Sequence, residues 1–162
     1  MKRGLIVAGA ILLVLAILGA RGFVLYRNRW GRQSIIRRDV YQNFELMRRD
    51  LAHQGVDVEI TGGWRGEVEQ QEHLAAGTSR ARWGLSPHNY GVAFDLVPVV
   101  NGAATWDVPT ATWKKIGEAG KRAGLVWGGD FKTIVDRPHF ELAGWRSMNL
   151  ALLPTAPGTM PA

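Results

Sequence analysis

The segment SPHNYGVAFD, residues 86–95, places His88 and Asp95 seven residues apart. Gly91 between them can adopt backbone angles that turn the chain sharply, and the residues that follow it, VAFDLVPV, alternate as in a strand. Asp95 is then the only charge on an apolar strand, where a carboxylate must be paired or bound to a metal. The turn could bring His88 over the strand face that carries Asp95. A His–Asp hydrogen bond and a shared metal ion explain this spacing equally well.

A second group of ionisable residues favours the metal. The segment VDRPHFEL near the C-terminus holds Asp136, His139 and Glu141 within six residues, and in a strand His139 and Glu141 share a face. Two histidines and one aspartate, with water in the fourth position, form an open tetrahedral zinc site of the catalytic kind. Zinc lowers the pKa of its bound water to about 7. Either Asp136 or Glu141 could then shuttle the proton of that water.

The rest of the chain predicts the elements that position these residues. Apolar residues at steps of three and four within residues 34–53 predict an amphipathic helix, and residues 56–61 alternate as a strand. Residues 67–76 and 110–123 predict two further helices, while LVWGGDF and RPHFEL predict short strands. The prediction is one α+β domain, with helices packed on a small antiparallel sheet.

Charge and composition exclude several classes of protein. The 162-residue chain has a net charge of +6, but residues 1–38 contain eight Lys or Arg and no Asp or Glu. The remainder is nearly neutral, which argues against a nucleic-acid-binding domain. No cysteine is present, so disulfides and thiolate metal ligands are excluded.

An uncharged run, GLIVAGAILLVLAILGA, occupies residues 4–20 after Lys2 and Arg3. Its seventeen residues reach the lower end of a membrane span. A cleaved signal peptide is the alternative, but Leu18 stands where a small residue is needed. The predicted organisation is a transmembrane anchor with a basic connector over residues 1–33, a folded domain over 34–148 and a disordered, Pro-rich tail over 149–162.

These motifs together resemble a known family. SPHNYGVAFD fits the pattern SxHxxGxAxD, DRPHFEL fits DxPHFE, and GWRGEVEQQEHLAAG and GLVWGGDF are similar to two further family segments. Over about residues 60–142 the chain resembles the zinc peptidases that cut peptidoglycan stem peptides. This family comprises D-Ala-D-Ala carboxypeptidases and L-alanyl-D-glutamate endopeptidases, and the resemblance is closest to its phage-endolysin branch. No HExxH motif occurs, which argues against the larger class of zinc proteases.

The resemblance implies a hedgehog/D-Ala-D-Ala peptidase-like fold and one bound Zn²⁺. His88, Asp95 and His139 would bind the zinc, and Asp136 would be the catalytic base and acid. Because the carboxypeptidases commonly have Glu at that place, Asp136 favours the endopeptidase branch. Glu141 is then expected to support the ligands.

The resemblance also implies residues that bind substrate. Arg65 would hold a substrate carboxylate or the developing oxyanion, because Arg grips such groups with two parallel hydrogen bonds. Ser86 and Gln70 would complete the substrate-binding set and support the site. Trp127 is expected in the core.

The expected function is hydrolysis of a stem-peptide bond, foremost the L-alanyl-D-glutamate bond, by a monomer in wall lysis or remodelling. A D-Ala-D-Ala carboxypeptidase and a non-catalytic zinc domain that binds a wall peptide are the alternatives. Peptidoglycan lies outside the cytoplasmic (inner) membrane, so the domain is expected on the periplasmic or external side, anchored through residues 4–20. The arginines that follow this run favour the opposite orientation. They could also form a patch for anionic lipids.

Overall fold

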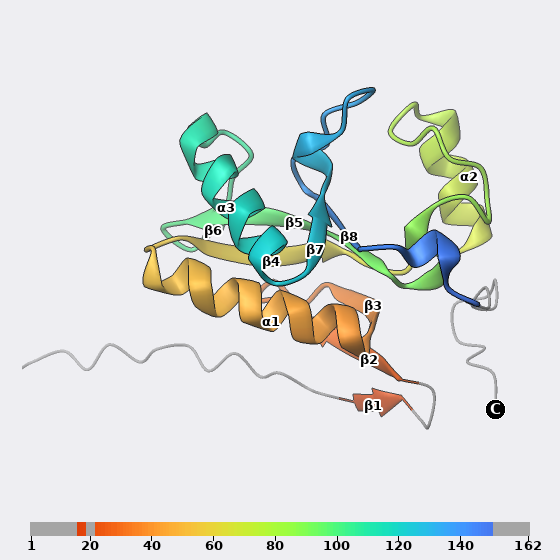
Figure 1. The fold of residues 1–162 in the computed structure, drawn as a ribbon, viewed down its shortest axis with the longest axis horizontal. Helices are drawn as coiled ribbons and strands as arrows, with labels where there is room; N and C mark the ends of the chain where they lie inside the picture. Colours follow the sequence, from red (N-terminus) through yellow and green to blue (C-terminus); the bar gives the residue numbers. More distant parts are fainter. Residues whose placement is uncertain (1–15, 19–21, 151–162) are drawn as a thin grey trace, which may run out of the picture.

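Figure 1 shows the computed structural model, which describes residues 16–18 and 22–150. The helices are α1 (Arg38–His53), α2 (Glu67–Ala75) and α3 (Thr110–Arg122). The strands are β1 (Ala16–Leu18), β2 (Phe23–Arg27), β3 (Gln33–Arg37), β4 (Asp57–Gly62), β5 (Ala93–Val100), β6 (Ala103–Ala104), β7 (Leu125–Trp127) and β8 (His139–Leu142). The described strands pair antiparallel throughout, so the predicted α+β class with an antiparallel sheet is confirmed.

The larger sheet has the strand order β4-β5-β8-β7, with β6 added beside β5. Its core face packs against α1 and α3. The ring of Phe94 on β5 stacks on Phe140 of β8 at 5.6 Å and meets Phe44 of α1 edge-on at 5.3 Å. Because strand residues alternate between faces, Asp95 and His139 point away from this core. The predicted alternation of β5 is confirmed, and it leaves the opposite face free for chemistry.

Helix α1 begins four residues later than predicted. Residues 34–37 belong to β3, where Ser34 and Ile36 both point inward with the period of two that a strand requires. The five apolar residues of the predicted helix are all completely buried: Ile36, Val40, Phe44, Met47 and Leu51. The core prediction is therefore confirmed, although Ile36 reaches the core from a strand.

Residues 22–33 were expected to form a connector outside the domain, and this expectation is wrong. They form β2 and the turn into β3, and this hairpin packs on the domain. The Tyr26 hydroxyl donates a hydrogen bond to the Glu59 carboxylate on β4, and Arg29 Nε donates to the same carboxylate at 2.9 Å. Glu59 is only 1% exposed, so these partners replace the water that a buried charge has lost. The folded domain thus includes the hairpin.

The predicted anchor at residues 4–20 lies mostly outside the described residues. Its three described residues, Ala16–Leu18, form β1 and pair with β2 rather than continuing a helix. Across 16–18 and 22–150, no helix combines the length and the apolar character that a membrane crossing demands. The predicted tail is described only at residues 149 and 150. Both the anchor and the disordered tail stay predictions.

Candidate functional site

The three predicted zinc ligands come together on the sheet face opposite the core. His88, Asp95 and His139 each offer one ligand atom within 4.8 Å of the others. His88 Nε2 lies 3.2 Å from His139 Nδ1. Asp95 Oδ1 lies 3.4 Å from the first nitrogen and 3.3 Å from the second. Both histidines are buried, and Asp95 is partly exposed.

Local structure explains why residues so distant in sequence meet. Asp95 on β5 and His139 on β8 are direct partners in the register of the two strands, so their side chains lie side by side. His88 comes from the 3-10 turn Pro87–Tyr90, which ends at Gly91 in the left-handed conformation with φ of 66°. A Cβ at Gly91 would also lie 2.9 Å from the Phe23 ring. Glycine is therefore required there, as the sequence predicted, to return the chain from His88 into β5.

The hydrogen bonds of the outer nitrogens determine which nitrogen of each imidazole ring carries the proton, and this shows that the site needs a positive charge. His88 Nδ1 lies 2.7 Å from the Gly63 carbonyl, and His139 Nε2 lies 3.1 Å from a Glu141 carboxylate oxygen. Because these oxygens only accept, the outer nitrogens carry the protons and donate them. In the neutral rings the inner nitrogens then face each other and Asp95 as three acceptors with no donor between them. Such a set fits a cation, and imidazole nitrogen with carboxylate oxygen is a ligand set for zinc.

In the metal-free protein, a proton can neutralise this cluster. Burial opposes a charge on His139, but its hydrogen bonds with Asp95 and Glu141 outweigh burial and raise its pKa to about 9. Burial also opposes ionisation of Asp95, yet His88 and His139 reverse that effect and hold the pKa of Asp95 well below its usual range. Zinc must displace the proton on His139, so the apparent affinity for zinc falls as the pH falls.

Glu141 supports the ligands in the way that the sequence predicted. One carboxylate oxygen binds His139 Nε2, while the other accepts a hydrogen bond from Trp145 Nε1 at 3.1 Å. This pair of contacts fixes the orientation of the His139 ring and increases its basicity.

Glu141→Gln is expected to weaken zinc affinity by about 10- to 100-fold, because the neutral amide no longer makes His139 a stronger ligand. Competition with a chromophoric zinc chelator measures this change. Trp145→Phe is the matched control: it removes the indole donor from Glu141 but keeps the carboxylate charge, so its effect should be smaller. An unchanged affinity in Glu141→Gln would contradict the supporting role.

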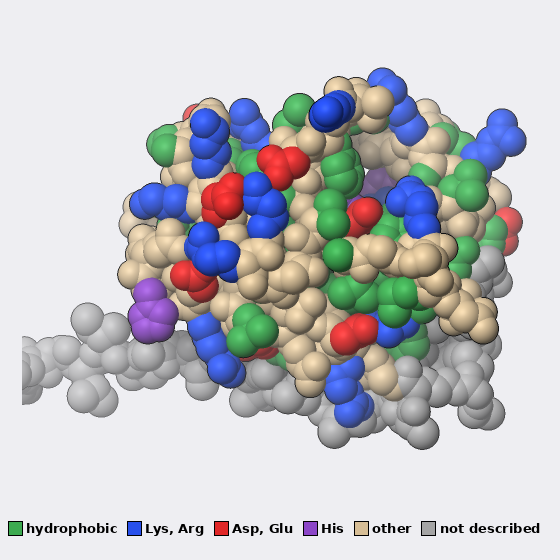
Figure 2. Space-filling model, in the orientation of Figure 1, with side chains coloured by type: hydrophobic (Ala, Val, Ile, Leu, Met, Phe, Trp, Pro, Cys, Tyr) green, Lys and Arg blue, Asp and Glu red, His purple; other side chains and the backbone are tan. Residues whose placement is uncertain are grey.

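Asp136, the predicted base, borders the ligand cluster from the exposed segment that leads into β8. Partial burial of its carboxyl raises the pKa of Asp136, and the negative charge of Asp95 raises this pKa further. The charges of His139 and His88 lower it, but by less. Figure 2 shows a hollow on this face in which a histidine side chain is visible at depth, with acidic and basic side chains at its edge. A carboxyl group whose pKa is raised in this way is better suited to accept a proton than an ordinary aspartate.

Arg65 also reaches the site. Its Nη2 lies 3.4 Å from Asp95 Oδ2, and its side chain is 11% exposed. Its backbone N–H donates to the carbonyl of His88 at 3.1 Å, so the segment that carries Arg65 and the turn that carries His88 hold each other. The guanidinium retains donors for an anionic group beside the ligands.

Gln70 and Ser86 were predicted to contact substrate, and the structure places both beneath the surface, 0% and 4% exposed. Gln70 Nε2 donates to Ser79 Oγ at 2.9 Å and to the Ala81 carbonyl at 2.6 Å, and its Oε1 accepts from Arg65 at 3.5 Å. The amide of Gln70 is occupied by protein partners, which agrees with a supporting role, and its contact with substrate stays a prediction. Gln70 holds Arg65 and the following loop in place.

Asn89 is a site-supporting residue that the sequence analysis missed. Its Oδ1 accepts hydrogen bonds from the backbone of Gly84 and Ser86, and its Nδ2 donates to the Arg65 carbonyl at 3.1 Å. These bonds hold the turn that presents His88. The only local signal was an amide residue directly after a predicted ligand.

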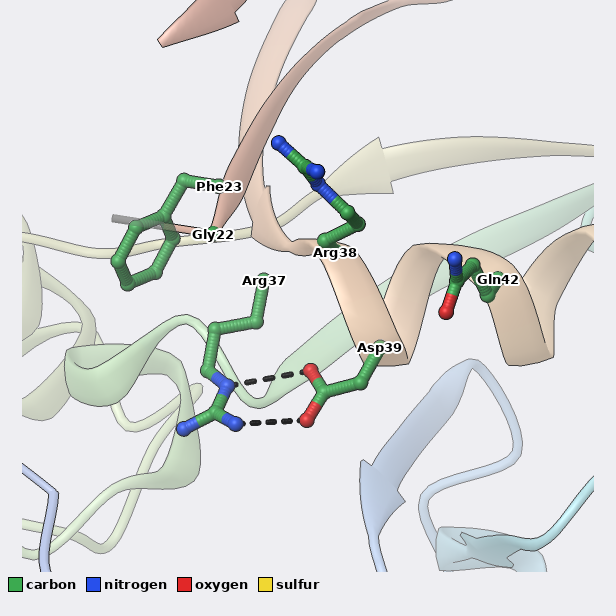
Figure 3. Close-up of a pocket in the computed structure, with 6 residues that line it drawn as sticks. All are labelled: Gly22, Phe23, Arg37, Arg38, Asp39 and Gln42. Carbon is green, nitrogen blue, oxygen red and sulfur yellow. Dashed lines mark hydrogen bonds and ion pairs between the residues drawn. The ribbon is translucent and has the colours of Figure 1, made fainter. Parts of the chain in front are cut away.

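A separate hollow of about 400 Å³ lies where β2 and α1 begin (Figure 3). The guanidinium of Arg37 at its edge is already neutralised by Asp39 through bonds of 3.1 and 2.6 Å. None of its lining residues is a predicted site residue. They are Gly22, Phe23, Arg37, Arg38, Asp39 and Gln42. This hollow is therefore distinct from the ligand cluster.

Comparison with known proteins agrees with this geometry. The family model described as D-alanyl-D-alanine carboxypeptidase matches residues 79–142, a span that contains the three ligands and Asp136. The peptidoglycan L-alanyl-D-glutamate endopeptidase CwlK of Bacillus subtilis is 35% identical over 118 residues, which cover 64% of this chain and 71% of CwlK.

Solved structures share the fold. The L-Ala D-Glu endopeptidase ChiX of Serratia marcescens matches with a TM-score of 0.58 and 28% identity, over 69% of this chain and 84% of ChiX. The vancomycin-resistance D,D-pentapeptidase VanY, solved with Zn(II), matches with a TM-score of 0.57 and 19% identity, over 75% of this chain and 79% of its own; at that identity it shows the fold alone. The ligand set, the family match and the identity to CwlK together place this chain in the D-alanyl-D-alanine carboxypeptidase family of zinc metallopeptidases.

Proposed function

We propose that this metallopeptidase hydrolyses the L-alanyl-D-glutamate bond of peptidoglycan stem peptides, as a monomer, in wall lysis or remodelling. The observation that carries the proposal is the convergence of His88, Asp95 and His139 with Asp136 at the edge of the cluster. The choice of bond is supported by two relatives, CwlK and ChiX, that are both endopeptidases of this type. An aspartate at position 136 agrees with this choice.

The residues divide the reaction between them. Bound zinc would polarise the scissile carbonyl and lower the pKa of the attacking water. Asp136 would take the proton from that water and deliver it to the leaving amine nitrogen, since it is exposed and its carboxyl is within reach of the charges of the three ligands. Arg65 would hold a substrate carboxylate or the developing negative charge beside Asp95. Gln70 and Asn89 would keep Arg65 and His88 in register while these groups act.

Digestion of purified muropeptides by the zinc-loaded full-length protein, followed by mass spectrometry, tests the proposal. The expected products end in a free L-alanine carboxylate and a free D-glutamate amine. Release of terminal D-alanine alone would instead assign a carboxypeptidase. Zinc binding without any cleavage would assign a non-catalytic domain that binds wall peptides. The same assay with Asp136→Asn shows whether this site catalyses the cleavage, because the variant should then form much less product.

We also propose that the uncharged N-terminal run holds the enzyme at the cytoplasmic membrane, with the catalytic domain on the side of the peptidoglycan. Support comes from residues 4–20, which carry no charge and follow two basic residues. Fusion of periplasmic and cytoplasmic reporter enzymes to the C-terminus tests the orientation. Activity of the cytoplasmic reporter alone would overturn this arrangement.

A further inference from the structure

Trp127, expected only to fill the core, also contacts the segment that carries Asp136. The indole Nε1–H donates a hydrogen bond to the carbonyl of Arg137 at 2.8 Å. The carbonyl of the next residue, Gly128, accepts the backbone N–H of Asp136 at 2.9 Å. Residues 127 and 128 therefore grip residues 136 and 137 by two hydrogen bonds, one on each side of the peptide unit that follows Asp136.

The indole has little freedom to move. It is 7% exposed and fits against two glycines, Gly117 on α3 and Gly129. A Cβ added to either glycine would lie 2.2 Å from an indole atom, so the close approach on both sides requires glycine. Lys121 lies over the ring at 6.0 Å. The ring is fixed by packing, and its one hydrogen bond therefore fixes the Arg137 carbonyl.

Gly128 is held equally closely. A Cβ there would lie 2.4 Å from the Asp136 carbonyl oxygen and 3.0 Å from His139 Cβ. The Asp136 carbonyl in turn accepts the backbone N–H of His139 at 3.2 Å. The backbone of the base is thus tied on one side to Gly128 and on the other to a zinc ligand.

We propose that Trp127 is a positioning residue for Asp136: its indole N–H and the Gly128 carbonyl form a clamp that sets the base against the zinc ligands. This inference rests on the proposed function. It explains why the base can stand on an exposed segment, whose neighbours Ile134 and Val135 are 42% and 61% exposed. The clamp makes the place of Asp136 independent of the conformation of that exposed tip.

Two replacements at Trp127 test the clamp in the zinc-loaded full-length protein. Trp127→Phe removes the donor and part of the ring, whereas benzothienylalanine at position 127 replaces the N–H by sulfur and keeps the ring volume. Both are expected to lower kcat on stem peptides by about 10- to 100-fold, because a displacement of about 1 Å has effects of this size. KM and zinc content should not change. Trp113→Phe is the matched control, since Trp113 is a buried core tryptophan of α3, 3% exposed, and it should keep the wild-type kcat.

A kcat unchanged by benzothienylalanine would overturn the clamp. An equal loss in Trp113→Phe would reduce the effect to general core damage and would overturn it too. A raised KM at unchanged kcat would assign Trp127 to substrate binding instead of positioning.

Amide hydrogen exchange at Asp136 supplies a readout without activity. Its N–H is bonded to Gly128 in the intact clamp, so exchange should become faster in both Trp127 replacements and stay slow in Trp113→Phe. If the wild-type protein cleaves no stem peptide, the proposed function fails, and the exchange rate still decides whether Trp127 positions Asp136. Unchanged exchange would overturn the clamp even in an active enzyme.

Discussion

Asp136→Asn is expected to lower kcat by about 10²- to 10⁴-fold, the usual contribution of a general acid–base group, which corresponds to about 3–5 kcal/mol of transition-state stabilisation. Asparagine keeps the size of the side chain but cannot accept the proton of the attacking water. The three ligands are untouched, so the zinc content should equal that of the wild type. Steady-state kinetics with stem peptides and elemental analysis of the same preparations measure both quantities.

Asp130→Asn is the control for this experiment. Asp130 is an exposed acid between β7 and β8 that pairs with Lys121 at 2.9 Å, and its replacement should leave kcat within about twofold of the wild type, as surface changes usually leave a protein nearly unaffected. An Asp136→Asn protein with full zinc content and a wild-type rate would show that another group moves the proton.

His88→Ala is expected to reduce bound zinc from about one ion per chain to almost none and to reduce activity to background. Three ligand atoms from one turn and two strands make the site, and the loss of one leaves a pair that cannot hold zinc against competing chelators. His53→Ala removes an exposed histidine at the end of α1 and should change neither quantity. Elemental analysis after dialysis against a chelator measures the zinc.

Readdition of zinc to the chelated wild-type protein should restore its activity, and readdition to His88→Ala should not. Full activity in His88→Ala after dialysis would contradict the assignment of the metal site, whatever peptide the enzyme cuts.

The ligands could be predicted because each lies in a short motif whose local structure sets the direction of the ligand side chain. The strand period placed Asp95 on the face opposite Phe94, and the need for a sharp turn at Gly91 followed from residue type alone. His139 was harder, since its approach to Asp95 depends on the β5–β8 register, which only tertiary structure reveals. His139 was identified because it is a second histidine, and two histidines with one aspartate form a ligand set for zinc.

Two supporting residues escaped prediction for a physical reason. Asn89 and Trp127 act through hydrogen bonds to the backbone of distant segments, and backbone partners leave no mark in the sequence. The hairpin at β2 and β3 was missed for another reason. Its arginines resembled those of a solvated connector, whereas Arg29 forms ion pairs with Asp57 and Glu59 on β4. The run of aromatic and β-branched residues in FVLY, which is typical of a strand, was the better signal.

The pairing of Asp95 with His139 across β5 and β8 has a consequence for the lifetime of the protein. An ion held there joins the two central strands of the sheet, and the unfolded chain, in which these residues are far apart, has no equivalent site. Zinc at 100 times its dissociation constant would add about 2.7 kcal/mol to the free energy of unfolding. Proteases attack the open form in proportion to its population, so zinc supply would govern resistance to degradation as well as catalysis.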